Sequence, residues 1–123
     1  MSEKDRQGKV FFGKRERFSD LLNACLYDGQ QVILSDELDE METEINESKN
    51  SHDVVQRRRD LLKKQVKDHK TVMVYGLELQ STVEKLMPLR MMEYDALTYS
   101  EMKKKQNSMC ALASMVLYTG ESR

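Results

Sequence analysis

The sequence contains only two cysteines, Cys25 and Cys110, and neither belongs to a CxxC or Cys/His pattern. Both lie among apolar residues, where a thiol behaves as a small hydrophobic side chain. We therefore interpret them as reduced core cysteines. The chain lacks the cysteine content of a disulfide-stabilised secreted domain or of a cysteine-ligated metal site.

Long apolar runs are also missing. No stretch approaches the roughly 20 apolar residues that a membrane-spanning helix needs. Residues 1–18 lack the apolar core of a signal peptide, and residues 1–10 are polar and expected to be disordered. These absences predict a cytoplasmic protein with no membrane partner. We separately expect no small-molecule cofactor.

Neither sign of charge dominates. The 123 residues include 20 Lys and Arg against 21 Asp and Glu, for a net charge of −1. This balance argues against a protein that coats nucleic acid, although it leaves room for local basic patches. The length predicts one domain, residues 1–123, with a modest core.

The most strand-like stretch is TVMVYGLELQ, residues Thr71–Gln80. Alternation along a strand places Met73, Tyr75, Leu77 and Leu79 on one apolar, core-facing side. The other side carries Val72, Val74, Gly76, Glu78 and Gln80. A charge at the end of a buried strand is costly unless a metal or a partner compensates it. On periodicity alone, the alternative is an edge strand whose polar end is exposed to solvent.

Flanking segments predict further elements. Apolar spacing favours a helix from Phe11 to Tyr27, closing at Asp28–Gly29, and another over Met87–Gln106 with Pro88 near its start. The acidic run SDELDEMETEINES, which begins at Ser35, is expected to be an exposed helix or a mobile loop. Val54–Lys70 fits either a helix or a strand ending. Met109–Tyr118 is uniformly apolar and reads as a buried strand, or as a short buried helix followed by a strand.

Five segments in order resemble the PD-(D/E)XK nuclease family transposases, a bacterial group of recombination-promoting nucleases. They are RFSDLLNACLYDGQQV followed by SDEL, then RRRDL, VYGLELQ, MPLRMMEYDALTY and LASMVLYTG. The resemblance runs from about Phe18 to Gly120, and the spacing of Asp60 and Glu78 agrees with it. Members of the family are generally longer, so the resemblance implies a domain truncated after its fourth strand-like segment.

The resemblance implies an α/β fold with a restriction-endonuclease-like core, a mixed sheet flanked by helices. It further implies an Mg²⁺ site, with Mn²⁺ able to replace Mg²⁺, in which Asp60 and Glu78 are ligands and Gln80 is the third catalytic motif residue. Asp20 is a weaker candidate ligand. Gln80 stands where many such nucleases have Lys, and an amide cannot carry a proton or a positive charge. Tyr94, Asp95 and Tyr99 also match family positions.

The implied partner is DNA and the implied activity is phosphodiester cleavage in a mobile element. Nearby basic residues would contact phosphates without reading sequence. They are Arg57, Arg58, Arg59, Lys63 and Lys64. A solvated charged surface is the alternative for these residues. For the whole chain, the alternatives are an inactive remnant that serves as a binding or homodimerisation module, and a small helical adaptor.

Overall fold

A computed structural model describes residues 3–41, 44–50, 53–58, 60–106 and 110–118. Two helices come first, a short 3₁₀ turn and five strands follow, and a long helix separates the last two strands. The bounds are α1 Glu3–Gly13, α2 Arg15–Leu26, η1 Ser35–Glu37, β1 Leu38–Glu40, β2 Glu44–Asn50, β3 Asp53–Arg58, β4 Leu61–Lys67, β5 Lys70–Gln80, α3 Met87–Gln106 and β6 Ala111–Tyr118.

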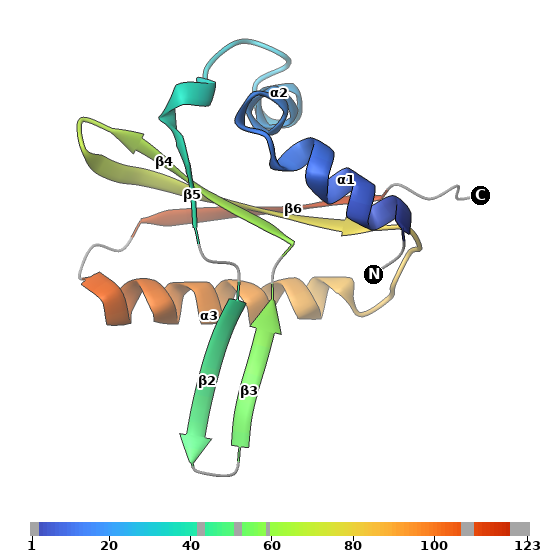
Figure 1. Ribbon diagram of the computed structural model, residues 1–123, viewed down its shortest axis with the longest axis vertical. Coiled ribbons are helices and arrows are strands. Elements are labelled where there is room, and N and C mark those ends of the chain that lie inside the picture. The colour runs from blue at the N-terminus through green and yellow to red at the C-terminus, as the bar shows by residue number, and fades with distance from the viewer. Residues whose placement is uncertain (1–2, 42–43, 51–52, 59, 107–109, 119–123) are drawn as a thin grey trace.

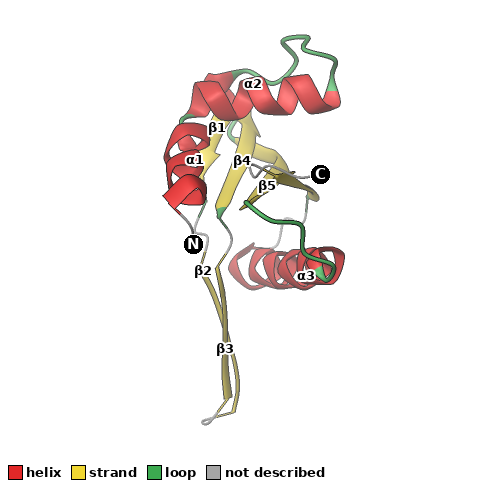
Figure 2. Cartoon of the chain, turned by 90° about the vertical axis from the view of Figure 1, so that its right-hand side faces the viewer, coloured by secondary structure: helices red, strands yellow, loops and turns green. Residues whose placement is uncertain are grey.

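The described strands form one mixed sheet of four strands in the order β1-β4-β5-β6, and a separate β2–β3 hairpin. β4 pairs antiparallel with both β1 and β5, whereas β6 pairs parallel with β5 after the α3 crossover. Figures 1 and 2 show α1 and α2 over one face of the sheet, α3 over the other, and the hairpin projecting away from the sheet. The protein is therefore α/β, as the sequence predicts.

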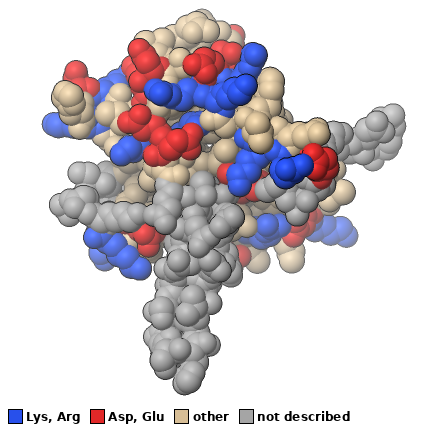
Figure 3. Space-filling view, viewed as in Figure 1, with Lys and Arg blue, Asp and Glu red and all other residues tan. Residues whose placement is uncertain are grey.

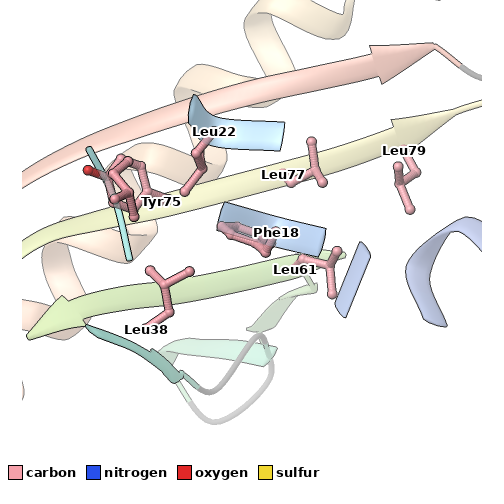
Figure 4. Packing of buried hydrophobic residues seen from close by; sticks show 8 residues of the cluster. Phe18, Leu22, Leu38, Leu61, Tyr75, Leu77 and Leu79 are labelled. Atoms are coloured by element: carbon pink, nitrogen blue, oxygen red, sulfur yellow. The ribbon is translucent and has the colours of Figure 1, made fainter. Parts of the chain in front are cut away.

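The larger core lies between the two amino-terminal helices and the sheet. Phe18 and Leu22 of α2 are buried against Leu61 of β4 and Leu77 of β5, as Figure 4 shows. Burying a side chain of this size stabilises the fold by about 1.5–3 kcal/mol. The core-facing side predicted for the central strand is confirmed, because Met73, Tyr75, Leu77 and Leu79 all belong to this cluster.

A smaller core lies under α3, where Met102 packs with Leu62 and Val74. Polar bonds supplement this packing along β6. The Ser114 hydroxyl donates to Asp95 Oδ1 at 2.6 Å, and the Leu112 amide donates to the Tyr99 hydroxyl at 3.0 Å. Asp95 and Tyr99 therefore attach α3 to β6. The predicted helix Met87–Gln106 is confirmed at both bounds.

The segment that the sequence leaves ambiguous, Val54–Lys70, contains β3 and β4 and no helix among its described residues. Leu61 pairs with Leu77, so Asp60 directly precedes a strand. β4 lies between β1 and β5, and a central strand is buried on both faces, which hides the alternation from which strands are recognised.

Two expectations need correction. The acidic run is not an exposed helix or a mobile loop over Ser35–Glu40: after one short 3₁₀ turn, η1, it forms strand β1, in which Leu38 is fully buried, and Glu37 accepts a hydrogen bond from the Gln65 side chain at 2.9 Å. Residues 1–10 are predicted to be disordered, yet α1 begins at Glu3, with Met1 and Ser2 outside the described residues. Gly8 lets this helix approach the sheet, because an added Cβ would lie 3.4 Å from Leu79 Cδ1.

The cysteines and the last strand also differ from expectation. Both cysteines are free, as expected, but Cys25 is exposed because α2 turns Phe18 and Leu22 inward instead. Cys110 is half-buried and packs against the smaller core. Residues 111–118 form a strand, β6, but its side chains are half-buried or exposed, since it is the outermost strand of the described sheet. No helix in the described ranges is both long and apolar enough to span a membrane.

The β4–β5 hairpin turns without glycine. Asp68 and His69 have φ values of 52° and 65°, so two consecutive L-residues occupy the left-handed region that a type I′ turn requires. Such a conformation costs a residue with a Cβ about 1–2 kcal/mol. Glycine and asparagine are the residues that such turns favour, and here Asp68 and His69 form the turn with strained backbones instead.

We expect His69→Gly to stabilise the protein by about 0.5–1 kcal/mol, because glycine adopts positive φ without a steric cost but gains freedom in the unfolded chain. Urea denaturation would measure the change. His69→Val serves as the control and should destabilise, since a branched Cβ is poorly tolerated at positive φ. Equal stability of the two variants would contradict a strained turn.

Candidate functional site

The structure brings Asp60 and Glu78 together where β4 begins and β5 ends. The Asp60 amide donates to Glu78 Oε1 at 3.2 Å, and the Leu79 amide donates to Asp60 Oδ2 at 2.8 Å. Each carboxylate therefore accepts a backbone bond from the other's strand. These reciprocal bonds fix two acidic side chains at one point of the sheet.

Glu78 is only 3% exposed and lies on the sheet face opposite Leu77 and Leu79, the face covered by α3. Gln80 follows two residues later, so strand alternation places it on the same face, and it is half-buried. The two hydrogen bonds thus join Asp60 to the end of β5, and strand alternation places Gln80 on the same face as Glu78. A buried carboxylate is stable only with compensating hydrogen bonds or a cation.

Asp20 does not extend this pair. It is exposed on α2, which packs over the opposite face of the sheet. Within the described residues, no three His, Cys, Asp or Glu side chains form a group able to hold a metal. A magnesium ion at Asp60 and Glu78 would therefore complete its shell with water, a backbone carbonyl or phosphate oxygens, as Mg²⁺ commonly does.

Lys63 does not fit its predicted role as a phosphate contact. Its side chain is completely buried and forms an ion pair with Glu40. The Lys63 Nζ atom lies 5.3 Å from the centre of the Phe18 ring. β4 alternation turns Lys63 toward the larger core, which the charge pattern of the sequence does not reveal. Lys64 points to the other face and is half-buried.

The side chains of the three predicted basic residues that precede Asp60 lie outside what the structure describes. Arg57 and Arg58 end β3, where the structure describes only the backbone, and Arg59 lies outside the described residues. On the face drawn in Figure 3, the coloured Lys and Arg side chains alternate with Asp and Glu. That described surface has no extended area of positive charge, in agreement with the balanced composition.

An arginine not singled out by the sequence lies near the start of α3. Arg90 Nη1 donates to Glu84 Oε2 at 2.7 Å, and Arg90 Nη2 donates to the Tyr94 hydroxyl at 3.0 Å. The hydrogen bond with Tyr94, together with the neighbouring Glu84 carboxylate, raises the pKa of Arg90 above its ordinary value. Spacing of four residues on a predicted helix could have indicated the Arg90–Tyr94 contact.

Asn23 is a second residue whose role was missed. Its side-chain amide donates to the Ile33 carbonyl at 2.9 Å and accepts from the Ile33 amide at 2.8 Å. Asn23 is 2% exposed, although a polar residue on an amphipathic helix is normally expected at the surface. It fixes the loop that connects α2 to η1, so its role here is structural.

Comparison of the chain with the models of known protein families, with curated proteins and with solved structures finds no match. The site is therefore interpreted from its own geometry and from the motif resemblance.

We expect Lys63→Met to change the free energy of unfolding by less than about 1.5 kcal/mol, because Met retains the apolar stem and the Glu40 carboxylate left without its partner is 67% exposed and can be solvated. Lys63→Ala should cost about 2–4 kcal/mol, since it leaves a cavity beneath Phe18. Chemical denaturation of both variants would measure this. Equal losses for Met and Ala would show that the charge, and not the packed stem, matters.

Proposed function

We propose that the chain is a divalent-metal-dependent DNA endonuclease with a restriction-endonuclease-like core. The observation that carries the proposal is the reciprocal bonding of Asp60 and Glu78 across β4 and β5. A carboxylate directly before β4 and one on β5 lie at one point, with Gln80 two residues after Glu78, and this arrangement supports a site for a hard cation.

The donor set suits magnesium. Carboxylate oxygens are the ligands that Mg²⁺ prefers, and the backbone amides of Asp60 and Leu79 hold both carboxylates in place. When bound, the ion would neutralise phosphate charge and lower the pKa of a coordinated water. Asp60 and Glu78 would hold the ion. Gln80 would orient a water or a phosphate oxygen through its amide, since it cannot accept the proton as a base.

The fold supports the same proposal. The antiparallel β4–β5 hairpin is followed by α3 and the parallel strand β6, which is compatible with the mixed sheet flanked by helices that the motif resemblance implies. Glu78 also lies near the carboxyl end of β5, a typical ligand-binding position in α/β proteins.

A second candidate is an inactive remnant that serves as a self-association module. The supporting observation is a set of exposed apolar side chains at and before the start of α3. They are Val83, Leu86, Leu89 and Met92, with exposed fractions of 68%, 63%, 54% and 69%. Exposed apolar clusters of this kind favour association. Size-exclusion chromatography across concentrations would detect it, and a monomer at every concentration would count against it.

For the nuclease, we expect Mg²⁺-dependent nicking of supercoiled plasmid that falls at least about 100-fold in Asp60→Asn and in Glu78→Gln. Both substitutions keep an oxygen that can accept the observed backbone bond, so they remove the charge with little change to the fold. Gel electrophoresis with Mg²⁺, with Mn²⁺ and with a chelator would measure the rates.

Two carboxylates serve as matched controls. Asp20→Asn and Glu93→Gln each remove one exposed charge from a helix, α2 or α3 respectively, and should nick at the wild-type rate. Full activity in both Asp60→Asn and Glu78→Gln would falsify the proposed site. A wild-type chain that nicks plasmid with neither Mg²⁺ nor Mn²⁺ would favour the inactive remnant.

A further inference from the structure

Arg90 occupies a defined position relative to the candidate carboxylate pair. Asp95 of α3 is bonded to Ser114, and Ser114 is the register partner of Gly76 on β5. Arg90 lies five residues before Asp95, about 7 Å along the helix axis. Glu78 lies two residues after Gly76, about 7 Å along the strand. Because α3 returns antiparallel to β5, Arg90 and Glu78 are at the same level of the sheet.

The side of the helix can be determined as well. Asp95 and Tyr99 face β6, since both are hydrogen-bonded to it. Successive residues are about 100° apart around a helix, which places Tyr94 and its contact Arg90 on the flank away from β6. In the sheet order, β5 and then β4 follow β6 on that side. Tyr94 is only 8% exposed, so it faces the sheet there, and Arg90, one turn earlier, lies at the margin of that flank with its side chain 37% exposed.

The guanidinium at this place is held but accessible. Glu84 and Tyr94 bind one terminal nitrogen each, and the Arg90 and Glu84 side chains remain 37% and 39% exposed. A guanidinium has five N–H donors in a planar fork that matches the oxygens of a phosphate. The bonds to Glu84 and Tyr94 fix its direction before any ligand arrives, which lowers the entropic cost of binding.

We propose that Arg90 binds a backbone phosphate of the DNA substrate beside the Asp60–Glu78 pair, and that Glu84 and Tyr94 position it. The assignment rests on the proposed nuclease function and names the residue by which the site holds its substrate. Two acidic side chains repel a polyanion, and a fixed cation at the same level of the sheet offsets that repulsion. The Glu84 carboxylate in turn neutralises the charge of Arg90 while no DNA is bound.

The experiment uses the full chain and a duplex oligonucleotide, with Ca²⁺ replacing Mg²⁺ so that binding is measured without cleavage. Arg90→Gln should weaken binding about tenfold, and should reduce the slope of log affinity against log salt by about 1, the loss of one phosphate contact. Arg90→Lys retains the charge and should keep the wild-type slope.

Glu84→Gln separates phosphate binding from a purely structural role. Arg90→Gln and Glu84→Gln remove the same ion pair from opposite sides, so a structural pair would give the same loss in both variants. A phosphate-binding arginine predicts different results for the two variants. Glu84→Gln keeps an oxygen that can accept the Arg90 bond, so Arg90 stays positioned, and it removes one negative charge. The salt slope should then stay at the wild-type value, and the affinity should be equal to or higher than wild type.

Arg6 provides a matched control, because it forms an exposed ion pair with Glu3 at the same 2.7 Å distance, on the helix that covers the other sheet face. Arg6→Gln should bind like wild type. A wild-type chain that binds no DNA contradicts the proposed function and this inference together. A chain that nicks plasmid while Arg90→Gln keeps the wild-type slope and affinity contradicts only the role of Arg90.

Discussion

The pairing of β5 with a neighbour on each side is the constraint on which the rest of the structure depends. β5 is antiparallel to β4 and parallel to β6, and it presents an apolar side to α1 and α2 and a mixed side to α3. Its register with β4 sets Asp60 opposite Glu78. Its register with β6 sets how far α3 reaches along the sheet, and through α3 the level of Arg90.

The candidate site follows from this pairing and not from a separate loop. Asp60 Oδ2 accepts the amide of Leu79, and Glu78 Oε1 accepts the amide of Asp60, so backbone groups at the end of the hairpin orient both acids. A one-residue slip of β4 would turn its side chains to the wrong faces and break both bonds. The geometry of the pair is therefore as rigid as the sheet itself.

Alternation was sufficient to predict the faces of β5 and the side on which Glu78 lies, because period-two patterning survives in a strand with one fully apolar side. The encounter of Asp60 and Glu78 was implied only by the motif resemblance. The buried Lys63, the Asn23 contact with Ile33 and helix α1 depend on partners far along the chain, which local patterning does not show. Polar residues in an amphipathic sequence are normally predicted to be exposed, yet Lys63 and Asn23 are among the most buried side chains described.

Strand β1 has a consequence for motion. It is three residues long and pairs only with β4 in the described sheet. The buried side chain of Leu38 and the ion pair between Glu40 and Lys63 hold it in place. Just before the strand, Glu37 accepts a hydrogen bond from Gln65. So few contacts make it a low-stability unit that opens locally while β4, β5 and β6 stay paired. Each opening would admit solvent to the Lys63 ammonium. In amide hydrogen exchange, β1 would therefore lose protection well before the strands that hold the carboxylate pair.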